Sequence, residues 1–280
     1  MRVIRRRKDP RRMSAVGGTP RPPRCDLHMH SDRSDGERPV EEVLAEAARV
    51  GLSSIAITDH DVPPGLPAGI HDGMRLIHGA EVSGLQDGRE LHLLVYFPEQ
   101  MPESFQDFLR ERARARAHRY DHAASTLGLE PAPPEAHAGD RAMTRLHLAK
   151  ALVAARRAGC LDAAFRGELR VGAAVQAIDL PFREAIERAR AAGGLPVWAH
   201  PSLEDCQRYL PLFTGWGLAG VEAWRPSLSV NRQAEVARIA LSHGLLLSGG
   251  SDWHGHGPHK LGSFGVKPAE IAPLIAALAA

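Results

Sequence analysis

Short apolar runs alternate with amphipathic segments along the chain from residue 25 onward. Three segments have apolar residues at helical spacing and end at glycine, which predicts helices over 40–50, 182–192 and 231–243. Strands that alternate with helices are typical of βα units around a parallel sheet, so we expect an α/β fold. The predicted strands are seven runs, at 25–30, 54–58, 75–80, 91–96, 195–199, 219–224 and 245–249.

The interval 101–178 breaks this alternation. It is rich in alanine and arginine and has helical patterns at 103–127 and 143–158. We therefore expect residues 25–100 and 179–270 to form the α/β domain, with 101–178 as a small helical insertion.

Composition agrees with a folded, water-soluble chain, because 44% of the 280 residues are hydrophobic and 24% are charged. No run approaches the ~18 uninterrupted apolar residues of a membrane span, and no apolar segment of a secretion signal follows the basic start. We expect a cytoplasmic protein without membrane contact. The three cysteines form no CxxC motif, so a disulfide framework is not expected.

Positive charge is concentrated at the start of the chain. Residues 1–24 hold nine lysines and arginines against a single acidic residue, Asp9, and the remaining residues are net acidic. With its glycines and prolines, this segment predicts a disordered basic tail. The overall net charge of +2 therefore does not indicate a nucleic-acid-binding surface on the folded part.

Histidine, aspartate and glutamate lie at the ends of nearly all predicted strands. His28 and His30 are two residues apart on one strand, so their side chains share a face and can converge on one metal ion. A lone histidine is more often a structural residue than a ligand. So many polar groups buried together without metal ions would leave uncompensated charges and unpaired donors, so the joint pattern predicts a metal site. The candidates are His28, His30, His60, Glu81, His92, His200, Asp252 and His254.

Several motifs stand in the order found in one protein family. They are DLHMHSDRSDG at 26–36, TDHD at 58–61, GAE at 79–81, AHP at 199–201, GVE at 220–222 and GSDWHG at 250–255. On these motifs, the sequence resembles the PHP (polymerase and histidinol phosphatase) metal-dependent phosphoesterases. The resemblance covers about residues 25–265 and implies a distorted (β/α)7 barrel, the PHP fold, which agrees in number with the seven predicted strands.

The resemblance also implies two or three divalent metal ions. Imidazole nitrogen and carboxylate oxygen without thiolate suit manganese, which we favour, and also iron or zinc. Asp35 lies in a Ser-Asp-Gly segment, for which an ordinary turn is the alternative. His256 and His259 could compete with an assigned ligand. The implied positions are His28, His30, Glu81 and Asp252 for one ion, the bridging Glu81 with His92 and His200 for a second, and Asp35, His60 and His254 for a third.

Other residues near the predicted strand ends are candidates for supporting roles. Glu222 is expected to orient a ligand, and Asp59 and Asp61 either do the same or lie in exposed turns. Arg225 is a candidate substrate-binding residue, and with Trp224 it could bind phosphate or stack on a base. Simple packing is an equal alternative for this pair.

The insertion is expected to supply phosphate recognition, because a guanidinium can grip a phosphate with two parallel hydrogen bonds. Arg145 and His147 lie in a segment that resembles one that related phosphoesterases carry in their insertion, and they are our catalytic candidates. Arg145 is also the first choice for binding substrate. Arg119 is a further candidate, although the arginine run at 110–119 is more often a solvated helix face.

These features predict a hydrolase that acts on a small phosphorylated substrate and has no obligate protein partner. The resemblance favours the branch that removes the 3′-phosphate of nucleoside 3′,5′-bisphosphates and, as an exoribonuclease, trims short RNA from its 5′ end through a metal-activated hydroxide. The alternatives are a histidinol-phosphate phosphatase and a nonenzymatic, metal-stabilised module such as an accessory domain of a DNA polymerase. A serine mechanism through Ser251 is disfavoured, because the sequence has no GxSxG motif.

Overall fold

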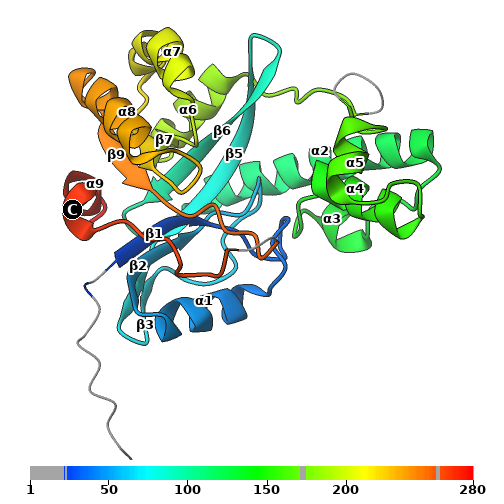
Figure 1. Cartoon of the computed structure of the whole chain (residues 1–280), viewed down its shortest axis with the longest axis horizontal. Helices are drawn as coiled ribbons and strands as arrows, with labels where there is room; N and C mark the ends of the chain where they lie inside the picture. Colours follow the sequence, from blue (N-terminus) through cyan, green and yellow to red (C-terminus); the bar gives the residue numbers. More distant parts are fainter. Residues whose placement is uncertain (1–21, 23, 171–174, 257–258, 280) are drawn as a thin grey trace, which may run out of the picture.

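The apolar runs of the sequence form two β-sheets, and helices pack against them (Figure 1). The computed structural model describes residues 22, 24–170, 175–256 and 259–279. Apart from residues 22 and 24, the predicted basic tail lies outside the described residues. Within the described ranges, no helix is both long and apolar enough to cross a membrane.

The first sheet has the strand order β1-β2-β4-β3 in the described residues. Its strands are β1 (Arg24–Met29), β2 (Leu52–Ile57), β3 (Gly69–His71) and β4 (Met74–Leu76). β1 pairs in parallel with β2, and β2 with β4, whereas the short β3 is antiparallel to β4. Helix α1 (Val40–Arg49) connects β1 to β2 and buries Val43 and Ala47 against Ile55 and Ile57. Glu41 and Glu42 in its first turn and Arg49 in its last favour the helix dipole.

The second sheet has the order β5-β6-β7-β8-β9. Its strands are β5 (His78–Gln86), β6 (Arg89–Phe97), β7 (Leu195–Trp198), β8 (Gly220–Trp224) and β9 (Leu246–Gly249). The pairs β5·β6 and β6·β7 are antiparallel, and β7·β8 and β8·β9 are parallel. This sheet carries the largest hydrophobic core, in which Phe182, Trp198 and Phe213 pack ring against ring.

Helices cover the second sheet and form a separate group on the other side of the molecule (Figure 1). α6, α7 and α8 contact strands or one another at the second sheet, whereas α3 and α4 contact α2. The first half of α2 buries Phe105 and Leu109 in the core of the second sheet. Its second half buries Tyr120 and Leu127 in a smaller core shared with α4 and α5. The remaining bounds are α2 (Glu103–Leu127), α3 (Pro134–Ala138), α4 (Arg145–Ala154), α5 (Leu161–Arg166), α6 (Phe182–Ala191), α7 (Leu203–Trp216), α8 (Val230–Ser242), η1 (Pro268–Glu270) and α9 (Ala272–Ala277).

The mixed α/β class is confirmed, but the expected parallel sheet is wrong in two respects: the strands form two sheets, and both sheets contain antiparallel pairs. The predicted strand 75–80 spans the end of β4 and the start of β5, and β3 was not predicted. β5 and β6 form an antiparallel hairpin because Asp87 and Gly88 both adopt positive φ, 49° and 73°. An Asp-Gly dipeptide is a strong hairpin signal, so the sequence did carry this information.

Strand pairing in the described residues does not close the two sheets into one ring. They meet instead at isolated bridges. His60 bridges to Glu81 between the end of the first sheet and β5, and Met29 bridges to Trp253 beyond β9. These junctions bring the ends of β1 and β2 next to the second sheet, where the polar residues gather.

Candidate metal centre

Histidine, aspartate and glutamate side chains from both sheets meet in one cluster. We call these nine residues the His/Asp/Glu cluster: His28 on β1, His30 and Asp35 after it, His60 after β2, Glu81 on β5, His92 on β6, His200 after β7, and Asp252 and His254 after β9. All nine are residues that the sequence predicts as ligands. Glu81 and His92 nevertheless lie within long strands and not at strand ends as predicted. The reason is the antiparallel β5·β6 hairpin, which presents inner positions of both strands to the cluster.

Glu81 lies at the centre of the cluster and is 1% exposed. Its Oε2 is 3.2 Å from Nε2 of both His28 and His30. Its Oε1 is 3.0 Å from His92 Nδ1 and 3.0 Å from His200 Nε2. One carboxylate therefore faces two separate pairs of imidazoles, which is the placement expected of a ligand that bridges two metal ions.

Asp252 closes one side of this arrangement. Its Oδ1 lies 3.2 Å from His28 Nε2 and 3.3 Å from His30 Nε2. Its backbone N–H donates to the His28 carbonyl at 2.8 Å, which ties the loop after β9 to β1. The four ligand atoms of the first predicted metal position, on His28, His30, Glu81 and Asp252, lie within 4.8 Å of one another.

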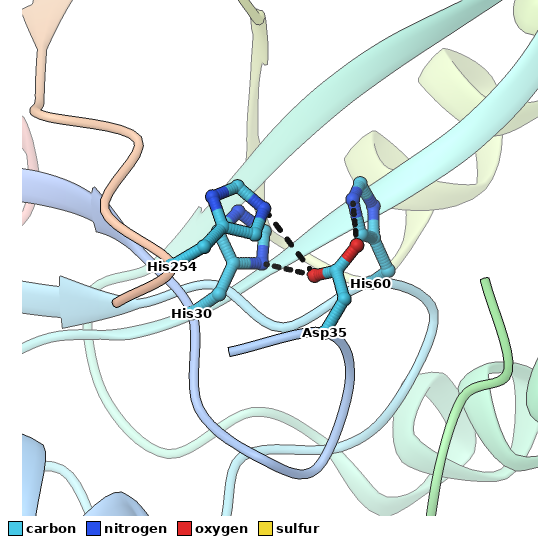
Figure 2. A group of neighbouring side chains, drawn as sticks. All are labelled: His30, Asp35, His60 and His254. Carbon is cyan, nitrogen blue, oxygen red and sulfur yellow. Dashed lines mark ion pairs between the residues drawn. The ribbon is translucent and has the colours of Figure 1, made fainter. Parts of the chain in front are cut away.

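Asp35 organises a second side of the cluster (Figure 2). Its Oδ1 is 3.3 Å from His254 Nε2 and 3.7 Å from His30 Nδ1, and its Oδ2 is 3.7 Å from His60 Nε2. These atoms match the third predicted metal position, with His30 added to it. Asp35 is 7% exposed, which disagrees with the alternative of an ordinary surface turn.

Several buried nitrogens of the cluster lack a hydrogen-bond partner among the described residues. They are His28 Nε2, His30 Nε2 and His60 Nδ1. Each lies 3.2 or 3.3 Å from Glu81 Oε2, yet without hydrogen-bonding geometry. Buried polar atoms are rarely left unpaired, and imidazole nitrogens facing carboxylate oxygens are a donor set that divalent cations accept. The residues present therefore fit metal ions.

The backbone near the cluster adopts conformations that few side chains tolerate. His200 and Asp252 have φ of 36° and 54°. Non-glycine residues at positive φ are uncommon, and such strain tends to collect at functional sites. Gly250 lies so close to β1 that an added Cβ would come within 2.4 Å of the His28 Cβ. Glycine at 250 therefore permits the close approach that brings Asp252 to His28.

Burial and the surrounding carboxylates together set the pKa values of the cluster histidines. Burial opposes the charged form of His30, but the nearby carboxylates of Asp252 and Glu81 outweigh it and raise its pKa to about 10. His92 behaves in the same way, with burial outweighed chiefly by the charge of Glu81, and its pKa also rises to about 10. For His60 burial prevails and lowers the pKa to about 3, which leaves this imidazole neutral. Protons supply positive charge to the cluster here, and divalent cations can take over that role.

Glu222 is fully buried beneath the cluster and touches two of its members. Its Oε1 lies 2.9 Å from His28 Nδ1, and its Oε2 accepts a 2.8 Å hydrogen bond from the His200 backbone N–H. A carboxylate on Nδ1 directs the Nε2 lone pair of His28 toward Glu81 and Asp252. This is the orienting position that the sequence predicts for Glu222.

Asp59 and Asp61 are 4% and 0% exposed, so the exposed-turn alternative is wrong for both. Asp59 accepts hydrogen bonds from Ser31 N at 2.8 Å and from the hydroxyls of Ser31 and Ser34 at 2.5 and 2.6 Å. It thereby shapes the loop that carries Asp35. Asp61 accepts from Arg116 Nε at 2.6 Å and from Ser83 N at 3.1 Å.

The arginine run on α2 is not a solvated face throughout, which corrects the alternative weighed for it. Arg112 and Arg116 are 8% and 5% exposed, whereas Arg110 forms ion pairs with Glu103 and Asp107 at the surface. Arg116 binds Asp61 and also donates to Ser83 Oγ at 2.6 Å. The spacing of 112, 116 and 119 along one helical face was the signal that sequence reasoning missed.

Arg119 and Arg145 line a cavity of about 330 Å³ that opens onto Asp35, His60 and His92. Arg119 Nε and Nη1 have no hydrogen-bond partner among the described residues, although these atoms are buried. Burial and the nearby charge of Arg116 lower the pKa of Arg119. Arg145 donates from Nη2 to the Leu169 carbonyl at 2.8 Å.

His147 lies in the first turn of α4. Its Nδ1 accepts a 3.0 Å hydrogen bond from the Thr144 backbone N–H, so it caps the helix that carries Arg145. Burial lowers the pKa of His147 to about 4, although the charge of Asp35 opposes the shift. At neutral pH this side chain is therefore an uncharged imidazole whose proton is on Nε2.

The remaining candidates have structural contacts. Arg225 is 5% exposed and donates from Nη2 to the Pro201 carbonyl at 2.7 Å, which favours packing over an open phosphate site. His256 lies between Glu37 Oε1 at 2.6 Å and the Asp35 carbonyl at 2.7 Å, outside the His/Asp/Glu cluster. Ser251 Oγ has no hydrogen-bond partner in the described part of the chain, so no base is placed to activate it.

A second cavity of about 310 Å³ also borders Asp35. Asp252 and His254 form part of its wall, and His259, Lys260 and Phe264 line it as well. Asp35 lines both cavities, and other residues of the His/Asp/Glu cluster line each of them, so both offer space for a ligand next to the metal candidates.

The chain is similar to one protein-family model and to several known enzymes. The model of the PHP domain family matches residues 26–132. A phosphoribosyl 1,2-cyclic phosphate 1,2-diphosphodiesterase from Eggerthella lenta is 31% identical over 250 residues, which cover 82% of this chain and 94% of that protein. The 5′-3′ exoribonuclease Rnm of Salmonella typhimurium is 29% identical, over 82% of this chain and 84% of that protein. A 3′,5′-nucleoside bisphosphate phosphatase from Chromobacterium violaceum is 29% identical, over 83% and 87%.

A solved structure gives the same picture for the fold. It comes from Bifidobacterium adolescentis, and its assignment as a metal-dependent phosphoesterase is provisional. The two structures match with a TM-score of 0.73 and 25% sequence identity, over 92% of this chain and 97% of that one. The similarity therefore extends over the helices α2–α5 as well as the two sheets.

Proposed function

Because this chain belongs to the PHP domain family, we propose that it is a metal-dependent phosphoesterase that hydrolyses phosphate esters of nucleotides. The observation that carries the proposal is the His/Asp/Glu cluster, whose buried nitrogens lack hydrogen-bond partners in the described residues and face the carboxylate of Glu81. A nucleophilic side chain is not needed in such a site, because water activated by the metal ions would supply the nucleophile.

Two or three divalent ions would be held by this cluster. His28, His30, Glu81 and Asp252 would hold the first, Glu81 with His92 and His200 the second, and Asp35, His60 and His254 the third. The ligand chemistry suits manganese, and also iron or zinc. When bound, such ions lower the pKa of a coordinated water to about 7 and neutralise phosphate oxygens. The chain's own contribution is to hold the ligands apart at fixed spacing and to shield them from bulk water.

The helices between β6 and β7 would bind the phosphate. In this proposal the metal-binding domain consists of residues 25–100 and 179–270, and residues 101–178 are an insertion in it. We interpret the two sheets of the domain as the halves of an opened, distorted (β/α)7 barrel. Arg119 supports this role, because it lines the cavity beside His92 and its buried Nε and Nη1 have no hydrogen-bond partner in the described residues. Arg145 lines the same cavity, and neutral His147 can donate Nε2–H to a phosphate oxygen.

Replacing Arg119 by methionine is expected to raise KM for a phosphate-ester substrate about 10-fold or more, since a charge-assisted hydrogen bond contributes roughly 1.5–3 kcal/mol. Methionine keeps most of the apolar stem that packs along α2. Steady-state kinetics measure the effect. The matched control is Arg110→Met on the same helix, where the arginine pairs with Glu103 and Asp107 at the surface. Equal KM values for the two variants would show that Arg119 does not bind substrate.

Glutamine in place of Glu222 is expected to weaken metal binding about 10–100-fold, the usual effect of losing a group that orients a ligand. The amide keeps the size of the side chain but can no longer present an acceptor to both His28 and the His200 N–H. Metal titration against a competing chelator measures the affinity. Glu235→Gln, at an exposed position of α8, is the control. Unchanged affinity in the Glu222 variant would contradict the orienting role.

The proposed substrate is a ribose phosphate ester, with a nucleoside 3′,5′-bisphosphate or the 5′ end of short RNA as the first candidates. Two features support it. The similar proteins named above act on a nucleoside bisphosphate, on RNA and on a phosphoribosyl cyclic phosphate. In addition, the two cavities that Asp35 lines offer room for one phosphate beside Arg119 and for the rest of the molecule beside Phe264.

Phosphate release from adenosine 3′,5′-bisphosphate, with manganese present, tests this assignment. Histidinol phosphate and a ribose cyclic phosphate serve as rival substrates under the same conditions. We expect the bisphosphate to have the highest kcat/KM of the three. Preferential turnover of histidinol phosphate would support the alternative phosphatase instead. Absence of hydrolysis with every ester, in protein shown to contain metal, would favour the nonenzymatic module.

A further inference from the structure

Outside the His/Asp/Glu cluster, another group of metal-ligating side chains lies on the helices between β6 and β7. His118 and Asp121 are on α2, and His137 is on α3. One ligand atom of each residue lies within 4.8 Å of the other two. We call these residues the His118–Asp121–His137 triad.

The geometry of the triad follows from the helix repeat and from the turn that joins the two helices. His118 and Asp121 are three residues apart, so they share one face of α2. α3 contacts α2 and places His137 Nε2 3.2 Å from Asp121 Oδ2. The rings of His118 and His137 have centroids 5.7 Å apart. All three side chains therefore point toward the same point between the helices.

A hydrogen bond to the second carboxylate oxygen of Asp121 fixes the orientation of this side chain. Asp121 Oδ1 accepts a 2.7 Å hydrogen bond from the backbone N–H of Ala132, in the loop before α3. Carboxylates that bind metals commonly have such a second partner, which fixes the direction of the free oxygen. His118 is exposed and His137 is 37% exposed on its side chain, so an ion and coordinating waters can reach the triad.

We propose that the His118–Asp121–His137 triad binds one transition-metal ion, separate from those of the His/Asp/Glu cluster. Two imidazoles and one carboxylate are the donor set that zinc, copper, nickel and cobalt take, and water completes the coordination. The three ligand atoms lie within 4.8 Å of one another. Small side-chain rotations would bring them to the spacing required for metal–ligand bonds of about 2.0–2.2 Å. The ion would join α2 to α3 across the loop 128–133.

This ion would have a structural role. α3 is a short helix followed, after Gly139, by the segment that leads to the N-terminus of α4 and to Arg145. Its contact with α2 rests on few apolar side chains, with Ala136 the only buried residue of α3 among the described residues. A metal ion held by both helices would stabilise their packing without contacting substrate.

Equilibrium dialysis of the full-length chain against zinc, followed by elemental analysis, tests the proposal. We expect His118→Ala/His137→Ala to bind one zinc equivalent fewer than the unsubstituted chain. The control is His122→Ala, an exposed histidine one residue beyond Asp121 that is not part of the triad, and it should bind as much zinc as the unsubstituted chain. Equal zinc content in all three proteins would overturn the proposal.

A second variant tests whether the loss of zinc is an indirect effect of removing the two imidazole rings. Asp121→Asn keeps an oxygen that can accept from Ala132 N–H but loses the carboxylate, so it should lower zinc affinity while leaving the metal-free melting temperature unchanged. Zinc should also raise the melting temperature of His122→Ala more than that of Asp121→Asn. Identical zinc-induced shifts in these two variants would show that the ion does not bind at the triad.

Discussion

Replacing Glu81 by glutamine is expected to reduce phosphate-ester hydrolysis at least about a thousandfold, because a catalytic metal ion supplies several kcal/mol and about 1.4 kcal/mol corresponds to a factor of ten. The two oxygens of Glu81 face His28 and His30 on one side and His92 and His200 on the other. An amide replaces one oxygen by a donor and removes the negative charge, so it cannot serve both sides. kcat/KM and the metal content of the purified variant measure the effect.

Glu99→Gln is the matched control for this substitution, since Glu99 is exposed just beyond β6 and touches none of the nine cluster residues. It should retain full activity and metal content. The glutamine at 81 is close in size to glutamate, so circular dichroism should show the same secondary structure for both variants. Normal turnover by a folded Glu81→Gln protein would refute a bridging role for this carboxylate.

Removal of metal by a chelator should abolish activity and lower the melting temperature. Without cations, buried carboxylates and unpaired imidazole nitrogens are left facing one another, which costs free energy. An ion present at 100 times its dissociation constant stabilises the native state by about 2.7 kcal/mol, which corresponds to a shift of roughly 5–10 °C for a chain of this size. Differential scanning calorimetry and phosphate release measure the two effects on the same sample.

Restoration of both properties by added manganese is the positive control for the chelation experiment. Chelator already saturated with its metal ion should change neither property, which separates metal removal from direct effects of the chelator on the protein. Full activity in protein shown by elemental analysis to contain no metal would end the metal-dependent interpretation. Recovery of activity and melting temperature with zinc or iron but not with manganese would show that the ion is not manganese. The metal-dependent mechanism would still hold.

Local sequence patterns were sufficient for much of the secondary structure. The helix predicted over 103–127 has the bounds of α2, and the three glycine-terminated helices correspond to α1, α6 and α8. These elements depend on residues three or four apart and on the turn that follows, so they can be read from short windows. The alternation of strands and helices predicts parallel strands and therefore not the antiparallel pair β5·β6, although the Asp-Gly turn at 87–88 is a hairpin signal.

The candidate ligands could also be identified from the sequence, since all nine predicted residues meet in the His/Asp/Glu cluster. What their positions in the sequence do not reveal is which atoms face one another. Glu81 acquires its central position from the hairpin register, in which it pairs with Leu94 two residues from His92. Glu222 reaches His28 across 194 residues, a contact that no local pattern encodes.

The arginine run shows the same division between local and long-range information. Helical spacing predicts which arginines share a face of α2, but whether that face meets water or protein depends on what packs against it. Arg116 is buried because Asp61, in the turn after β2, and Ser83, on β5, lie opposite it. The sequence by itself determined the elements and the types of ligand, because these follow from nearest-neighbour sterics and side-chain chemistry. Only the tertiary structure decided the contacts, because strand register and helix docking are set by groups distant along the chain.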